Sequence, residues 1–258
     1  MIFTQILVSA LMALNLVLNN LGWTVVLMTV IIKLLLLPLI LPSMKSAGKM
    51  RQLQPKLQKL TKQYGGDKQR LAKEQMKLYT SAGVNPMSGC LPQILQIAVL
   101  ILFYSSFQKL ISFSTGGIGV DELNRFLFDG LKVEPGFAMN TNFLGTDLAV
   151  TPSGAISSGL LANMILPLML LVGSGALQFW GAKLTVPDIK GSDETAYTKA
   201  TPEKGDDMQA ALRNQSLYMM PLMTIFIGFK FSVGILLYWF INSAMVVVQQ
   251  MLVGKIKK

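Results

Sequence analysis

Residues 25–42 read VVLMTVIIKLLLLPLILP, and this stretch decides the class of protein. It belongs to an apolar segment long enough to cross a bilayer, which takes roughly 20 residues. Lys33 lies near its middle, too deep for the side chain to reach either interface easily. Burying its ammonium in hydrocarbon costs at least about 2.5 kcal/mol. The stretch therefore predicts a membrane-spanning helix whose lysine is solvated by something other than lipid.

The composition of the whole chain is that of a polytopic membrane protein. Of its 258 residues, 52% are hydrophobic and 14% are charged, and the mean hydropathy is +0.49. His is absent and Cys90 is the single cysteine, so a disulfide within the chain is impossible and we expect no metal site. The sequence has neither a nucleophile paired with a base nor a phosphate-binding loop, so we expect no enzymatic activity and no cofactor.

Five apolar stretches predict an all-α polytopic membrane protein with five transmembrane helices. The fourth stretch is short, and residues 228–234 are typical of a tight turn that joins it to the fifth as a hairpin. The predicted spans are 22–42, 90–109, 160–182, 214–229 and 232–253, which leave an extracytoplasmic loop at 110–159, a cytoplasmic loop at 183–213 and a cytoplasmic tail at 254–258.

Residues 1–21 show two distinct faces on a helical wheel. Ile2, Phe3 and other apolar side chains share one face, whereas Ser9 and Asn15 lie on the opposite one. This pattern favours an amphipathic helix in the membrane interface. A sixth span or a signal anchor is the alternative, and a cleavable signal peptide is disfavoured because none of the first 32 residues is Lys or Arg.

The distribution of Lys and Arg predicts the orientation of the chain in the membrane. Residues 43–82 contain ten basic residues against two acids, whereas residues 112–159 contain two against five acids. We therefore expect the first of these segments in the cytoplasm and the second outside. With five spans, the N-terminus then lies outside and the C-terminus inside.

The basic segment at 43–83 has the pattern of a helical hairpin. Apolar residues recur at helical spacing on both sides of Gly65 and Gly66, and Asp67 is suited to cap the second helix. The charged outer faces can bind anionic lipid, an acidic protein partner or RNA. We favour lipid contact and protein docking, because no nucleic-acid motif accompanies the charges. The basic residues of this predicted docking surface are Lys49, Arg51, Lys56, Lys59, Arg70 and Lys73.

The predicted spans offer Lys33 polar interaction partners but no carboxylate. Thr29 lies one turn away on the same helix, and other spans carry Gln93, Gln96 and Asn242. No predicted span contains a carboxylate, so a buried ion pair is disfavoured. The pattern favours a water-filled cavity within the bundle over a structural lysine that extends toward the interface.

Between residues 20 and 254 the chain contains, in this order, TVIIKLLLLPL, KMRQLQPKLQKL, GGDKQRLAKEQMKLY, GVNPMSGCLPQILQI, NFLGTDL, SLYMMPLMTIF and GILLYWFINSAMVVVQQ. In this order, the motifs resemble the YidC/Oxa/Alb family of membrane protein insertases. The resemblance implies five helices around a hydrophilic groove that opens to the cytoplasm and to lipid but is closed to the outside. It also implies a short-form bacterial member in the plasma (inner) membrane, because the large extracytoplasmic domain of Gram-negative members is missing.

The resemblance also assigns residues to that groove. The family usually has an Arg at the position of Lys33, so this chain keeps the charge but loses the planar fork that binds carboxylates through two bonds. Thr29 and Gln96 match the polar part of the groove, and Tyr238 and Trp239 match an apolar surface that contacts substrate. The predicted groove residues are Lys33, Thr29, Gln96, Gln93, Tyr238, Trp239 and Asn242.

The function that the resemblance implies is membrane protein insertion. Lys33 would draw hydrophilic, often acidic, segments of nascent membrane proteins into the groove, and their apolar segments would slide along the second and fifth spans into lipid. Partners would be nascent membrane proteins and membrane lipids, with a Sec translocon, a signal-recognition receptor and the ribosome as further candidates and no sequence-specific contact with nucleic acid. The alternatives are a channel or secondary transporter that uses Lys33 as a gating or binding charge, and a scaffold that recruits partners through its hairpin.

Overall fold

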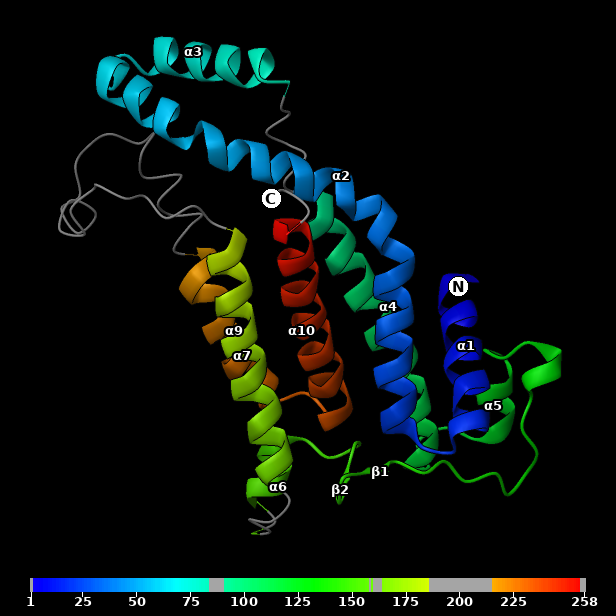
Figure 1. Ribbon diagram of the computed structural model, residues 1–258. Coiled ribbons are helices and arrows are strands. Elements are labelled where there is room, and N and C mark those ends of the chain that lie inside the picture. Colours follow the sequence, from blue (N-terminus) through cyan, green and yellow to red (C-terminus); the bar gives the residue numbers. More distant parts are fainter. Residues whose placement is uncertain (1, 84–90, 158, 160–163, 186–214, 256–258) are drawn as a thin grey trace.

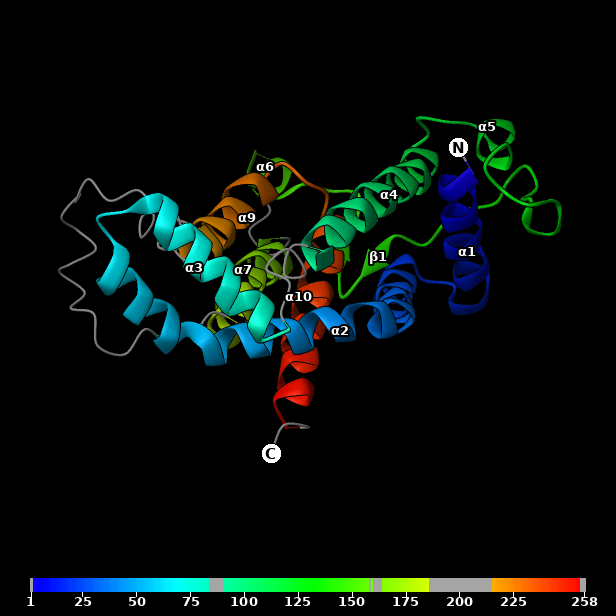
Figure 2. The ribbon, with the colours of Figure 1, turned by 90° about the horizontal axis from the view of Figure 1, so that it is seen from above.

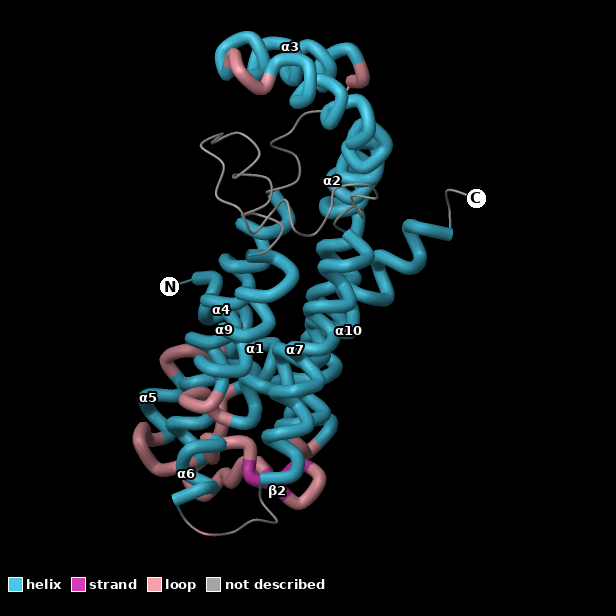
Figure 3. The backbone as a smooth tube through the Cα atoms, turned by 90° about the vertical axis from the view of Figure 1, so that its left-hand side faces the viewer, coloured by secondary structure: helices cyan, strands magenta, loops and turns pink. Residues whose placement is uncertain are grey.

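The computed structural model describes residues 2–83, 91–157, 159, 164–185 and 215–255. Most of these residues are helical, which confirms the all-α class. Two short strands, β1 (Asn142–Phe143) and β2 (Thr146–Asp147), form an antiparallel hairpin near one end of the bundle (Figure 3). Nearly all of the predicted loop at 183–213 lies outside the described residues, as do Cys90 and the last three residues of the predicted tail.

Within the described residues, four helices are long and apolar enough to cross a membrane. The apolar segments are Leu21–Met50, Gln93–Ser114, Ile165–Leu184 and Val233–Leu252. They belong to α2 (Leu21–Tyr64), α4 (Leu91–Ser114), α7 (Ile165–Thr185) and α10 (Val233–Lys255). In both ribbon views α10 stands among the others, and it packs against α7 and α2 (Figures 1 and 2).

The predicted fourth span is shorter than the other four. It consists of a π-helical turn at Gln215–Met219 followed by α9 (Met220–Gly228), and its apolar helical part is Leu217–Gly228. At 1.5 Å per residue this part measures about 18 Å, against about 30 Å of hydrocarbon. The helix packs against α7, where the Thr224 hydroxyl donates a hydrogen bond of 2.9 Å to Gln178 Oε1.

The helix α2 continues without interruption from the first predicted span into the predicted hairpin. It contains Pro38, Pro42 and Pro55, and Figure 1 shows it bending and passing over the end of the bundle. Proline removes one backbone hydrogen bond and crowds the preceding turn, which bends a helix rather than ending it when the flanking turns are packed. The boundary that we expected near residue 42 is therefore a bend within one helix.

The helix α1 (Ile2–Leu18) packs against α4 and α2 with its polar residues directed inward. Ser9 and Asn15 are buried, whereas Phe3 and Val17 are exposed. The Asn15 amide donates to the Thr24 hydroxyl at 3.5 Å, so protein rather than water satisfies it. Val8, Leu11 and Met12 are fully buried on the same side, so the inward face of α1 combines apolar residues with the two polar residues that we expected to face water.

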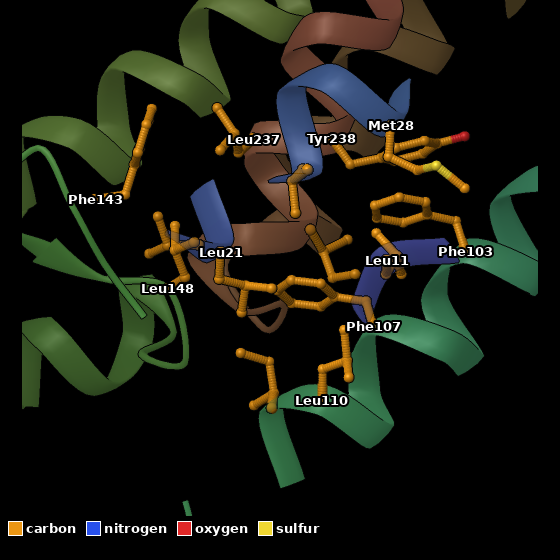
Figure 4. Packing of buried hydrophobic residues seen from close by; sticks show 14 of the residues in the cluster. Leu11, Leu21, Met28, Phe103, Phe107, Leu110, Phe143, Leu148, Leu237 and Tyr238 are labelled. Carbon is orange, nitrogen blue, oxygen red and sulfur yellow. The ribbon is translucent and has the colours of Figure 1, made fainter. Parts of the chain in front are cut away.

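The segment at 110–159, between the second and third predicted spans, closes one end of the bundle through backbone hydrogen bonds. The segment contains the short helices α5 (Val120–Asn124), η2 (Asp129–Leu131) and α6 (Pro152–Ser157). Its residues just before α6 bind the first residues of α10. There Val233 N donates to Val150 O at 2.8 Å and Gly234 N to Leu148 O at 3.0 Å. The aromatic core lies just above, with Phe103 stacked on Tyr238 at 4.1 Å between ring centroids (Figure 4).

Candidate functional site

Lys33 lies inside the bundle with an amide as its hydrogen-bond partner. Its relative exposure is 5%, and its Nζ donates to Gln96 Oε1 at 2.8 Å. The two residues are 63 positions apart in sequence, and their contact joins α2 to α4. An amide oxygen accepts a hydrogen bond from an ammonium but does not neutralise its charge. The structure thus buries the positive charge of Lys33 inside the bundle next to a neutral partner.

Tyr238 of α10 completes a chain of three side chains. Because Gln96 accepts through its oxygen, its Nε2 is free to donate to the Tyr238 hydroxyl, at 3.3 Å. Tyr238 is 1% exposed, and its ring is held by Phe103. We expected Tyr238 on an apolar surface that contacts substrate, but the structure places it in the core, where it fixes Gln96 and through it Lys33.

The ion pairs among the described residues lie elsewhere. They are Lys77 with Glu74 on the helix Lys68–Ser81 and Lys132 with Asp129 in the segment 110–159. A buried cation whose partner is a neutral amide recovers only part of the free energy that it loses on leaving water. Burial of Lys33 therefore lowers the stability of the fold. A residue that is kept at such a cost is typical of a functional charge rather than of a packing residue.

The other four predicted groove residues make no hydrogen bond to Lys33, Gln96 or Tyr238 in the described part of the chain. Thr29 is buried, but its hydroxyl donates to Val25 O at 2.6 Å along its own helix. Asn242 Oδ1, one turn beyond Tyr238, is buried and has no hydrogen-bond partner in the described part of the chain. Gln93 is exposed, one turn before Gln96 on α4. Trp239 is half-buried, with its ring 5.3 Å from that of Phe231.

Gln249 was not among the predicted groove residues, yet the structure brings it to the same site. Its Nε2 lies 3.5 Å from the backbone oxygen of Lys33, which ties α10 to α2 on the side of the basic hairpin. A buried glutamine in an apolar helix is the sequence signal for such a contact. The signal does not say which of the neighbouring glutamines, Gln249 or Gln250, faces inward.

The predicted docking surface lies on a hairpin made by the end of α2 and by α3 (Lys68–Ser81). Leu53 and Leu57 pack against Leu78 and Tyr79 in a cluster separate from the main core. The Asp67 carboxylate caps α3 by accepting from Arg70 N at 3.0 Å. Five of the predicted basic residues are exposed: Lys49, Lys56, Lys59, Arg70 and Lys73. The sixth, Arg51, has its backbone in α2, and its side chain lies outside the described part.

Two ionisable groups of α3 have displaced pKa values. A hydrogen bond from Lys77 lowers the pKa of the Glu74 carboxyl, and the positive charges of Lys77, Arg70 and Lys73 lower it further. Partial burial against α2 raises the pKa of the Tyr79 hydroxyl. Both shifts leave the charges at neutral pH as the sequence implies, so the hairpin stays strongly basic.

Comparisons with known proteins place the chain among bacterial membrane proteins. The family model described as 60Kd inner membrane protein matches residues 13–258. The chain is similar to the membrane protein insertase YidC of Dechloromonas aromatica, with 30% identity over 241 residues, which are 93% of this chain and 34% of the relative. For the protein of that name from Clostridium tetani, the identity is 28% over 237 residues, 92% of this chain and 83% of the relative.

A third relative, the membrane protein insertase YidC of Bordetella pertussis, is 36% identical over 173 residues, which are 66% of this chain and 29% of the relative. The chain thus spans about a third of the Dechloromonas protein but most of the Clostridium protein. Since the family model covers nearly every residue and the relatives share one name, the chain belongs to the 60Kd inner membrane protein family, that of the YidC proteins.

Proposed function

We propose that this chain is a membrane protein insertase. It draws the hydrophilic segment of a nascent membrane protein into a positively charged groove open to the cytoplasm, and it releases the apolar segment into lipid. The observation that carries the proposal is the buried ammonium of Lys33, whose partner is the Gln96 amide rather than an acid.

The electrostatic contribution of Lys33 is large enough to matter. Two unit charges 4 Å apart attract by about 1 kcal/mol in water but by about 4 kcal/mol at an effective dielectric constant of 20. An acidic side chain that enters the bundle would therefore regain part of the free energy that it loses on leaving water. When a carboxylate takes the place of Gln96 Oε1 on the ammonium, Gln96 keeps the hydrogen bond from its Nε2 to the Tyr238 hydroxyl.

Release into lipid needs an apolar surface that faces outward, and α4 and α9 are among the helices that expose one. On α4 the exposed apolar residues Ile94, Ile97 and Ile101 lie along one stripe. On α9, Leu222 and Phe226 are exposed. Because α10 is largely buried over its first turns, we assign the sliding surface to α4 and α9, which flank α10 in Figure 2, instead of the fifth span.

Depletion of the protein in its host tests this function against the rival classes. A small membrane protein with one span is expected to accumulate outside the membrane when the chain is depleted, and protease protection measures the inserted fraction. A channel, a secondary transporter or a scaffold predicts normal insertion. Plasmid-borne wild-type protein is the control, and unchanged insertion after depletion would contradict the proposal.

We also propose that the basic hairpin faces the cytoplasm and that the N-terminus lies outside. Single cysteines at positions 62 and 141, in place of Lys62 and Thr141 and in a Cys90→Ser background, are expected to react oppositely with a membrane-impermeant thiol reagent. Position 141 should react in intact cells, and position 62 only after lysis. Labelling of position 62 from outside would reverse the orientation and remove the basis for a cytoplasmic groove.

We further propose that the hairpin docks anionic lipid and an acidic region of a partner such as a signal-recognition receptor or a Sec translocon. Deleting residues 52–78 is expected to leave the bundle folded, because Leu53 and Leu57 form a cluster of their own. Insertion should fall about tenfold, the effect of losing about 1.4 kcal/mol of docking free energy. Thermal unfolding in detergent is the control, and a degraded bundle would assign the hairpin to the core.

A further inference from the structure

A hollow of about 300 Å³ lies beside the last turns of α4, at the end of the bundle remote from the basic hairpin. It is lined by Ser105, Gln108, Lys109, Ser112 and Ile118. Its volume is at the lower end of the range of small-molecule pockets. The lining combines one ammonium, two hydroxyls and a carboxamide with the side chain of Ile118, so it is mostly polar.

One wall of the hollow is fixed by a tight turn after α4. Gly117 N and Ile118 N both donate to Ser112 O, at 2.7 and 3.3 Å. Gly116 has a φ of 77°, which favours glycine, and a Cβ on Gly117 would come within 2.6 Å of Ser112 Oγ. Glycine at positions 116 and 117 therefore allows this turn to pack closely against the helix.

An aromatic ring positions the charge of the hollow. Lys109 Nζ lies 3.8 Å from the ring centroid of Phe126, which is within the range of cation–π attraction. The segment of Phe126 is in turn held by α1, because Ser9 Oγ donates to Phe126 O at 3.3 Å and accepts from Phe128 N at 3.1 Å. The inward-facing Ser9 of α1 thus serves to place this ring. The described residues hold no ion pair to Lys109.

The hollow continues an exposed stripe on α4. Ile101, Tyr104, Ser105, Gln108 and Ser112 follow one another at helical spacing, so they share a face. Ile101 and Tyr104 are exposed, and Lys109 precedes the last residue of the helix by five residues, or about 8 Å. The stripe is apolar in the membrane interior and changes to polar near the headgroup level, where lysines extend toward water.

We propose that this hollow binds the phosphodiester of a phospholipid from the leaflet on that side. Beside the Lys109 ammonium, the Ser112 hydroxyl and the Gln108 amide can donate to phosphate oxygens, whereas the Ser105 hydroxyl donates to Leu102 O at 3.0 Å. The apolar part of the stripe matches the acyl chains, which a free phosphate ion lacks. The site is independent of Lys33 and of the insertase proposal, because it lies at the opposite end of α4 from Gln96.

Lipid binding to the purified full chain in neutral detergent tests the proposal. Native mass spectrometry measures the fraction of chains that carry dioctanoyl phosphatidylglycerol as its concentration rises. We expect saturable binding of one lipid, weakened about tenfold in Lys109→Gln, since a hydrogen bond to a charged group is lost. Lys109→Arg should bind as the wild type does. Ser105→Leu, which fills the hollow and keeps the charge, should also weaken binding.

The matched control is Lys230→Gln, which removes an exposed lysine from the turn between α9 and α10 at the same end of the bundle. It should bind as the wild type does. If Lys109→Gln and Lys230→Gln lost lipid binding equally, the effect would be one of surface charge, and the proposed site would be wrong. Wild-type binding by Lys109→Gln would also contradict it. Dioctanoylglycerol should not compete. Displacement of the lipid by millimolar inorganic phosphate would show a free-phosphate site and overturn the assignment to lipid.

Discussion

Replacing Lys33 by Glu is expected to lower the insertion of a protein with an acidic tail by about 100-fold, or about 2.8 kcal/mol. The change turns attraction into repulsion at a buried position, where unit charges 4 Å apart interact by about 4 kcal/mol at a dielectric constant of 20. Lys33→Arg should retain insertion, because it keeps the charge and a similar reach. Protease protection of a radiolabelled substrate in vesicles measures the rate.

The amount of folded protein must be followed in parallel, because a buried Glu beside Gln96 also changes the fold's own electrostatics. Normalising insertion to the quantity of chain that unfolds cooperatively in detergent separates the two effects. Wild-type rates for the Glu variant, or equal losses for Glu and Arg, would show that the sign of the charge at this position does not act on the substrate.

Replacing Gly234 by Val is expected to destabilise the bundle by about 3 kcal/mol, the upper end of the usual cost of overpacking. A Cβ at Gly234 would overlap the ring of Phe107, which is fully buried and lies against Phe103 at 6.1 Å between ring centroids. The ring cannot withdraw without disturbing the core shown in Figure 4. Gly234 also donates the backbone hydrogen bond to Leu148 O that helps to close the end of the bundle.

Thermal unfolding in detergent measures this effect, and Gly119→Ala is the matched control. Gly119 has ordinary backbone angles, with φ −85°, and an added Cβ there meets no atom within 4 Å. It should unfold as the wild type does. If Gly234→Val unfolded at the same temperature as Gly119→Ala, the packing of α4 against the start of α10 would differ from that described.

Hydropathy and helical spacing predict the helices of this fold because both are local properties of the chain. The apolar stretches around Lys33 and Gln96 are long enough to span a membrane by themselves. The hairpin is likewise signalled locally, by Gly65 and Gly66 and by the cap of Asp67. Pro42 is ambiguous at this level, since proline ends a helix in one context and bends it in another.

Contacts between helices depend on rotation and depth, which single segments do not specify. The sequence shows that Gln96 and Asn242 are polar residues in apolar helices. Only packing decides that Gln96 binds Lys33, while Asn242 Oδ1 has no hydrogen-bond partner among the described residues. The face of α1 illustrates the same limit. A helical wheel separates Ser9 from Phe3, yet it cannot tell whether water or a protein backbone satisfies the serine.

The central claim, that Lys33 supplies a groove charge, is tested most directly by Lys33→Leu with two matched substrates. The substrates differ only in the charge of the translocated tail, acidic in one and neutral in the other. Removing a buried charge should leave the protein as stable or more so. We predict that the Leu variant inserts the neutral substrate at nearly the wild-type rate and the acidic one about tenfold more slowly. Insertion of both substrates at the wild-type rate would contradict the claim.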